Sequence, residues 1–283
     1  MSEPSTLDTN AVRGKAGGVP FIALPPIRPN DYAPTVIVWH MHDPPRSEAA
    51  MAAALPLRDV DAWRVYLGLP LSGTRLPPGG LEGFFALGYE DAVLKLYAPT
   101  VRQAVAEFPA ALAELRQRHG LLGGPIALVG ASIGAFVALS VLAGGEPPIS
   151  AIALVSPALR LTGVVAANER LFGVTYPWSD EARAIAAELD FVARTPALAR
   201  RGIPTLLVVG AEDDAEGIVR PAQEMAAALV HAGVDAKLAR IPGMAHAIAD
   251  EPGLEPMPQN AIAGVVDAVV SGWLRERFSR KPT

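Results

Sequence analysis

The chain has 283 residues, of which 51% are hydrophobic and 19% are charged, so it can bury a substantial core and is not a disordered protein. Its net charge of −5 disfavours a nucleic-acid partner, and the lack of cysteine excludes disulfides, thiolate metal sites and a cysteine nucleophile. The segment Met1–Asn10 is polar, and no apolar run reaches membrane-spanning length. We therefore expect a cytoplasmic protein that makes no membrane contact.

Short apolar runs alternate with helix-like segments along the chain. This alternation predicts an α/β fold with a doubly wound, mostly parallel sheet, in one domain spanning residues 1–283. In chain order the expected strands are Val19–Leu24, Thr35–His40, Ala62–Leu67, Ile126–Val129, Ile149–Val155, Thr205–Val209 and Ala236–Ile241. The expected helices are Ser47–Ala54, Val101–His119, Ile133–Ala143, Asp180–Thr195, Arg220–Ala232 and Asn260–Phe278.

Two stretches, Pro70–Tyr97 and Leu159–Trp178, fit this alternation badly. We expect at most a small lid, formed by Pro70–Tyr97 and Leu159–Asp190. The first is rich in glycine and proline, and both carry aromatic side chains that would suit a small lid or the wall of a pocket. Ordinary loop packing explains any single one of these aromatic residues equally well. The candidate pocket residues are Met41, Phe84, Phe85, Phe172, Tyr176 and Trp178.

A serine lies between an expected strand and an expected helix. Residues Gly130–Gly134 read GASIG, so Ser132 occupies the centre of a GxSxG motif after the run Ile126–Val129. Small residues on either side of the serine let a sharp turn expose its hydroxyl, and N–H groups at the start of the helix point toward the same place. Outside this strand-turn-helix context, the motif would indicate only a turn bounded by glycines.

A serine nucleophile needs a histidine base and usually a carboxylate that orients the histidine. His246 follows the last expected strand and is the strongest candidate base, whereas His119 and His231 lie near helix ends and are better explained as structural residues. The strand Thr205–Val209 leads into Gly-Ala-Glu-Asp-Asp, which ends at Asp214. The chain order serine, acid, histidine at three strand ends favours a catalytic triad.

Taken together, these motifs resemble those of the α/β-hydrolases, and in particular the compact bacterial serine esterases similar to dienelactone hydrolase and to prolyl oligopeptidase catalytic domains. The resemblance covers nearly the whole chain and rests on GASIG, on the Gly-x-x-Asp and Gly-x-x-His turns, and on a Pro-x-x-Gly-x-Arg loop that ends at Arg75. It implies an α/β-hydrolase fold with Asp213 as the triad acid and Asp214 as the alternative. Ser132 and His246 complete the implied triad.

The chain departs from this family after its second expected strand. The family usually has His-Gly there, whereas this chain reads Trp39-His40-Met41-His42-Asp43, with methionine in place of the glycine. We expect the backbone N–H groups of His42 and Ile133 to form an oxyanion hole. An alternative is a metal site formed by His40, His42 and Asp43, although no further ligands stand at a recognisable spacing.

We therefore expect an enzyme that cleaves a small-molecule carboxylic ester through an acyl-enzyme intermediate, with no metal or organic cofactor. A thioesterase or an acyltransferase would use the same triad. A peptidase is less favoured, and a non-catalytic binding protein of the same fold is the remaining alternative. The serine at the elbow argues against the dehalogenase and epoxide-hydrolase branches, which resemble this chain but carry aspartate there.

Overall fold

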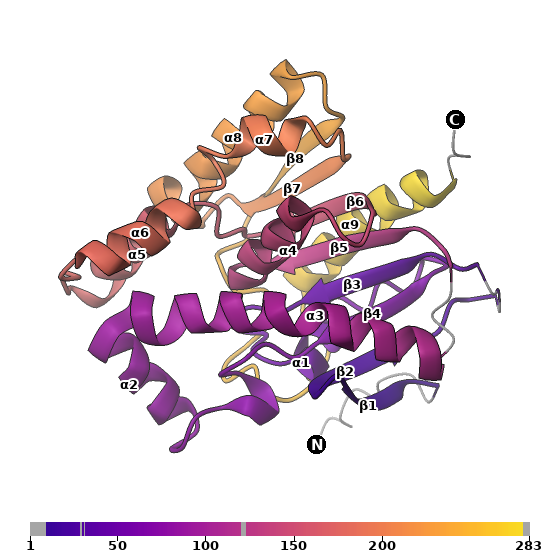
Figure 1. Ribbon diagram of the computed structural model, residues 1–283, viewed down its shortest axis with the longest axis horizontal. Helices are drawn as coiled ribbons and strands as arrows, with labels where there is room; N and C mark the ends of the chain where they lie inside the picture. The colour runs from indigo at the N-terminus through magenta and orange to yellow at the C-terminus, as the bar shows by residue number, and fades with distance from the viewer. Residues whose placement is uncertain (1–9, 29, 31, 120–122, 280–283) are drawn as a thin grey trace.

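The computed structural model describes residues 10–28, 30, 32–119 and 123–279 (Figure 1). The polar segment Met1–Asn10 lies almost entirely outside the described residues. The side chain of His119, the last residue of an expected helix, also lies outside them. In the part of the chain that is described, no helix combines the length and apolar character needed to cross a bilayer.

The described chain forms an eight-stranded sheet with the order β1-β2-β4-β3-β5-β6-β7-β8. Strands β3 to β8 are parallel, while β2 pairs with both β1 and β4 in the antiparallel sense. This arrangement confirms the doubly wound, mostly parallel α/β fold. The strands are β1 (Val12–Ala16), β2 (Val19–Leu24), β3 (Thr35–Trp39), β4 (Trp63–Leu67), β5 (Ile126–Ala131), β6 (Ile149–Val155), β7 (Thr205–Gly210) and β8 (Ala236–Ile241).

Strand β1 is absent from the sequence-based prediction. Its sequence VRGKA has three consecutive exposed residues, because the strand lies at the edge of the sheet and pairs only with β2. Such a strand lacks the apolar run that identified the central ones. The seven expected strands are confirmed to within two residues at each end.

Helices cover both faces of the sheet (Figure 1). On one face, α3, α4 and α8 pack over a core that contains Phe108 and Phe136. On the other face, α1 and α9 contribute Met51 and Trp273 to a second core. Successive strand residues point to opposite faces, so the strands are buried on both sides. The helices are α1 (Glu48–Ala54), α2 (Leu81–Asp91), α3 (Ala98–His119), α4 (Ile133–Gly144), α5 (Leu161–Phe172), α6 (Asp180–Glu188), α7 (Thr195–Ala199), α8 (Arg220–His231) and α9 (Ala261–Ser279), with a 3₁₀ turn at Gly73–Arg75 and π-helical segments at Ala92–Tyr97 and Ala215–Val219.

The two stretches that fitted the strand-helix alternation badly are largely helical. In the first, the glycines and prolines are concentrated before Leu81, and α2 then continues through the π-helical segment to α3. In the second, Leu161–Phe172 forms α5. The single helix expected at Asp180–Thr195 is wrong, because α6 ends at Glu188 and the N–H of Phe191 bonds back to a carbonyl before α5.

Candidate active site

Four predicted site residues lie just beyond the carboxyl ends of parallel strands. Trp39 at the end of β3 pairs with Gly130 near the end of β5, and Gly210 at the end of β7 pairs with Ile241 at the end of β8. The loops after these four strands carry His42, Ser132, Asp213 and His246, respectively. Because the strands are parallel, the carboxyl edge of the sheet gathers these side chains into one region.

Ser132 occupies a strained turn between β5 and α4. Its φ of 47° and ψ of −116° lie in a region that a residue with a side chain seldom adopts. The turn is held because the N–H of Ser132 donates to the carbonyl of Val155 at 3.0 Å. A Cβ on Gly130 would lie 2.5 Å from the carbonyl oxygen of Gly134, and one on Gly134 would lie 2.6 Å from that of Trp39. These close approaches account for both glycines of the GxSxG motif.

The structure brings Ser132, His246 and Asp213 into one hydrogen-bonded chain. Oγ of Ser132 lies 2.8 Å from Nε2 of His246, and Nδ1 of His246 lies 3.1 and 2.9 Å from the two carboxylate oxygens of Asp213. The Asp213 side chain is only 2% exposed. Burial opposes the charged imidazolium, but the hydrogen bond and charge of Asp213, together with the charge of Asp43, outweigh it and raise the pKa of His246.

Asp214, the alternative acid, points elsewhere. Its carboxylate binds Arg170 at 2.7 Å and accepts N–H bonds from Glu216 and Gly217, which caps the π-helical segment that follows. Partial burial on its own would raise the pKa of Asp214, but these hydrogen bonds and the charge of Arg170 lower it. Its backbone N–H donates to Asp213 at 2.7 Å, so this residue helps to orient the carboxylate that faces the histidine.

A contact between main chains sets the spacing of the acid and histidine loops. A Cβ on Gly210 would lie 2.1 Å from the carbonyl oxygen of Met244. That same oxygen accepts the N–H of Glu212 at 2.9 Å. Position 210 therefore has room only for glycine. Because Gly210 is three residues before Asp213 and Met244 is two residues before His246, this contact brings the two loops together.

The loop after β3 holds two buried histidines. The Nε2 atom of His40 accepts the N–H of Leu69 at 3.0 Å, which leaves Nδ1 to donate to the carbonyl of Met41 at 2.8 Å. Burial lowers the pKa of His40 to about 4 and, with the charges of His40 and Arg46, that of His42 to about 3. Both ring nitrogens of His40 bind backbone groups, so this histidine has no lone pair left for the alternative metal site.

The two expected oxyanion donors, the N–H groups of Ile133 and His42, lie at the ends of neighbouring elements. Ile133 is the first residue of α4, so its N–H precedes the hydrogen bonds of the helix, and His42 lies just beyond β3. Within the described residues, neither N–H has a backbone acceptor. The side chain of Met41, the residue that replaces the usual glycine, is fully buried in the core between the sheet and helices α1 and α9. Met41, a candidate pocket residue, thus packs in the core.

Two predicted pocket residues, Phe84 and Phe85 of α2, pack against the loop after β3. The ring of Phe84 is buried and meets the ring of His42 edge-on, with 5.0 Å between their centroids. Phe85 is 42% exposed, and the guanidinium of Arg46 lies 5.9 Å above its ring. These contacts place α2 beside the loop that carries the expected oxyanion donor.

The other three predicted pocket residues pack against α2 or against each other. Phe172 is 51% exposed and meets Tyr89 edge-on at 6.2 Å. The hydroxyl of Tyr176 donates to the Asp91 carboxylate at 2.5 Å, and its ring contacts Trp178 at 4.9 Å. Burial and the charge of Asp91 raise the pKa of Tyr176, so it remains a neutral donor.

Sequence reasoning missed a pair of residues that joins the two segments expected to form a lid or pocket wall. The Asn168 side chain on α5 donates to the hydroxyl of Tyr97 at 2.5 Å, and the Tyr97 ring stacks on His42 with 6.0 Å between centroids. Burial and the charge of Asp43 raise the pKa of Tyr97. Tyr97 was detectable as an aromatic at the end of the first segment, whereas nothing in the sequence distinguishes Asn168.

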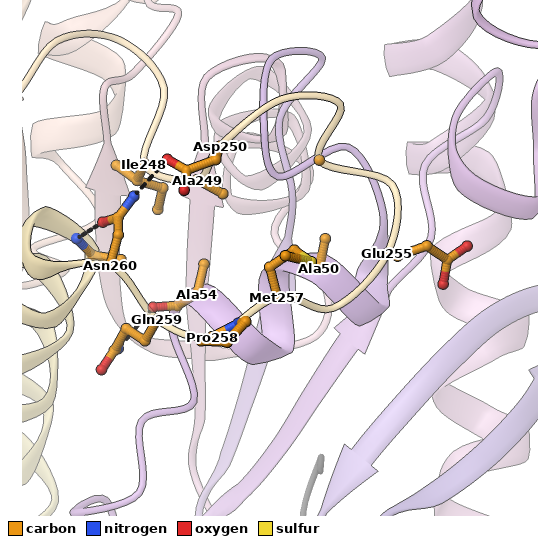
Figure 2. A pocket seen from close by; sticks show the side chains of 12 residues that line it. Ala50, Ala54, Ile248, Ala249, Asp250, Glu255, Met257, Pro258, Gln259 and Asn260 are labelled. Carbon is orange, nitrogen blue, oxygen red and sulfur yellow. Dashed lines mark hydrogen bonds between the residues drawn. The ribbon is translucent and has the colours of Figure 1, made fainter. Parts of the chain in front are cut away.

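A separate pocket lies between α1 and the segment 248–260 (Figure 2). Its lining includes Ala50 and Ala54 of α1 together with Ile248 and Met257. The labelled side chains of Asn260 and Asp250 meet at its rim through a hydrogen bond of 3.4 Å. None of the predicted site residues lines this pocket, so it is distinct from the region around Ser132.

Comparison with known families assigns the fold. A profile described as the alpha/beta hydrolase fold matches residues 96–250, a span that contains Ser132, Asp213 and His246. The chain belongs to the α/β-hydrolase fold family. No curated protein matches the sequence.

Solved structures of several other proteins resemble this one at low sequence identity. TT1662 from Thermus thermophilus has a TM-score of 0.61 and 16% identity, over 97% of this chain and 100% of that chain. Carboxyl esterase 2 from the mycorrhizal fungus Tuber melanosporum has a TM-score of 0.60 and 16% identity, over 98% and 89%. A puromycin-hydrolyzing peptidase from Mycobacterium tuberculosis has a TM-score of 0.63 and 16% identity, over 96% and 41%. At these identities the likeness shows the α/β-hydrolase fold alone.

In this α/β-hydrolase fold, Arg46 ties the loop after β3 to the loop after His246. Its guanidinium donates to the carbonyls of His42 at 2.8 Å and Pro252 at 2.6 Å, and it forms an ion pair with Glu251 at 2.5 Å. Its backbone N–H also donates to Gly253 at 2.6 Å. We call this set of contacts the Arg46 clamp. It fixes the loop of the expected oxyanion donor relative to the histidine loop.

Proposed function

We propose that this protein is a serine esterase that hydrolyses a small-molecule carboxylic ester through an acyl-enzyme intermediate. The observation that carries the proposal is the hydrogen-bonded chain from Ser132 through His246 to Asp213, with distances of 2.8 and 2.9 Å. Serine alone is a weak nucleophile, and these two partners are what its activation requires. The strained elbow and the first N–H groups of α4 support the same proposal.

Each residue has a defined role in the proposed reaction. Ser132 attacks the ester carbonyl while Nε2 of His246 takes its proton, and the N–H groups of Ile133 and His42 stabilise the oxyanion. His246 then delivers the proton to the leaving alcohol. Asp213 holds the imidazole in the tautomer with the proton on Nδ1 and stabilises the imidazolium. Water, activated by the same histidine, releases the acid.

The proposal is tested with nitrophenyl esters that range from acetate to long acyl chains. We expect Ser132→Ala to lower kcat by about four to six orders of magnitude and to abolish labelling by a fluorophosphonate, because the remaining donors cannot replace the nucleophile. The matched control is Ser150→Ala, which removes the hydroxyl of an exposed residue on β6. Among the described residues, this hydroxyl donates to the carbonyl of Ile126. If Ser132→Ala keeps a tenth of the wild-type activity, the proposal is wrong.

A further inference from the structure

The carboxylate of Asp43 lies beside the atoms that would react. Its Oδ2 is 3.6 Å from Nε2 of His246, the nitrogen that meets Oγ of Ser132 at 2.8 Å. The expected triad acid, Asp213, binds the other ring nitrogen. The Asp43 side chain is 50% exposed, so a second carboxylate borders the site on a side that solvent reaches.

The main chain around Asp43 is held in place from both sides. The preceding residue, His42, is bound through its carbonyl by the Arg46 clamp. The following residue, Pro44, accepts the N–H of Ile248 at 3.1 Å and restricts Asp43 to extended backbone angles. The backbone of Asp43 is therefore held relative to the loop that carries His246.

No cation in the described structure neutralises Asp43. Among the described residues, the only ion-pair partner within 4 Å is His246, which is neutral when it acts as the base. The nearby Arg46 is paired with Glu251, and Arg170 is paired with Asp214. The groups beside Asp43 are thus neutral or already paired, so its negative charge acts on whatever enters the site.

The leaving group of the ester is the part of the substrate nearest to this charge. In the proposed reaction Nε2 of His246 protonates the leaving oxygen, which must come within about 3 Å of that nitrogen. Oδ2 of Asp43 is 3.6 Å from the same nitrogen. The first atoms of the alcohol therefore pass close to the carboxylate, where a positive substituent is attracted and a negative one is repelled.

We infer that Asp43 is a specificity-determining residue that favours esters whose leaving alcohol carries a positive charge, such as a quaternary ammonium group. This inference rests on the proposed esterase function and names the substrate class of the same site. The attraction is of the size expected for a partly exposed ion pair, which corresponds to a preference of about fivefold in kcat/KM.

The test compares two esters of butyrate, one with choline and one with its uncharged carbon analogue, 3,3-dimethylbutanol. Acid release is followed at the alkaline plateau of each variant, so that His246 is neutral throughout. We expect Asp43→Asn to lower the ratio of kcat/KM for the choline ester to that for the neutral ester by about fivefold, with the neutral ester changed by less than about threefold. Asp43→Glu should keep the preference.

The matched control is Asp59→Asn, which removes the same charge from an exposed position before β4. This position lies near the amino ends of the parallel strands, away from the candidate site at their carboxyl ends. It should leave the ratio unchanged. A ratio that also stays unchanged in Asp43→Asn overturns the inference, as does an equal loss for both esters, which would show that Asp43 acts only through His246. If the wild type hydrolyses neither of these esters and none of the nitrophenyl esters, the proposed function itself fails.

Discussion

Asparagine variants of the adjacent residues Asp213 and Asp214 should have different effects. We expect Asp213→Asn to lower turnover and Asp214→Asn to lower mainly the stability of the fold. Both carboxylate oxygens of Asp213 lie within 3.1 Å of Nδ1 of His246, and its side chain is 2% exposed. Asparagine has the same shape but presents an N–H group to the imidazole, which favours the wrong tautomer. We expect Asp213→Asn to lower kcat by about 10⁴-fold, the size of the effect in well-studied triads.

Asp214→Asn should leave turnover within about threefold of the wild type. Asparagine keeps the oxygen that accepts the N–H groups of Glu216 and Gly217, so the cap survives and only the ion pair with Arg170 is lost. That pair is partly exposed and contributes about 0.2–1 kcal/mol to the free energy of unfolding. Asp214→Ala removes the cap as well and should cost a further ~1 kcal/mol.

The assays are kcat on a nitrophenyl ester and urea unfolding, measured on the same preparations. Unfolding shows whether a loss of kcat reflects the chemistry or the fold. If both asparagine variants lose activity mildly and equally, the acid is shared or lies elsewhere. If Asp214→Asn is the more damaging of the two, then Asp213 is not the residue that orients the histidine.

The remaining predictions concern pH and the contact between the acid and histidine loops. Burial alone would lower the pKa of His246, but Asp213 and Asp43 outweigh burial and raise it above 6.5. The acid limb of kcat/KM should therefore have its midpoint above pH 6.5. In Asp43→Asn this midpoint should move to lower pH. The raised pKa of the wild type also stabilises the fold fully below pH 6.5, and thermal unfolding should show this contribution lost as pH rises through the folded-state pKa. A limb at or below 6.5 would contradict this assignment of charges. Gly210→Ala should lower both kcat and, by ~2 kcal/mol, the free energy of unfolding, since its Cβ would lie 2.1 Å from the Met244 carbonyl. Gly272→Ala in α9, with nothing within 4 Å of its Cβ, should be neutral or stabilising by up to ~1 kcal/mol in the same unfolding assay.

The residues that sequence reasoning identified well are those that follow buried strands. Strands β5 and β7 are entirely buried, so their apolar runs predicted the sheet, and Ser132 and Asp213 stand one and three residues after their ends. The structure brings both side chains to His246 as expected, while their catalytic roles stay a prediction. The fold class is confirmed because the burial of parallel strands on both faces leaves a direct mark on the sequence.

The surroundings of the candidate site were harder to predict. The glycines and prolines before Leu81 obscured helix α2, whereas α5, whose apolar residues do recur at a helical spacing, was interpreted only as part of a lid or pocket wall. Asp43 entered the sequence argument only as part of a possible metal site. Its place beside His246 depends on hydrogen bonds between segments about 200 residues apart, such as that from Ile248 to Pro44, and no local pattern encodes such a contact.

The Arg46 clamp also decides which wall of the site can give way. Its guanidinium is buried and bonds to three partners on two loops, so these loops can separate only if several hydrogen bonds break at once. The segments around α2 and α5 are instead joined by single hydrogen bonds, from Asn168 to Tyr97 and from Tyr176 to Asp91. If the protein is the proposed esterase, we therefore expect a bulky ester to gain room by movement of α5 away from α2, while the loops that carry His42 and His246 keep their spacing.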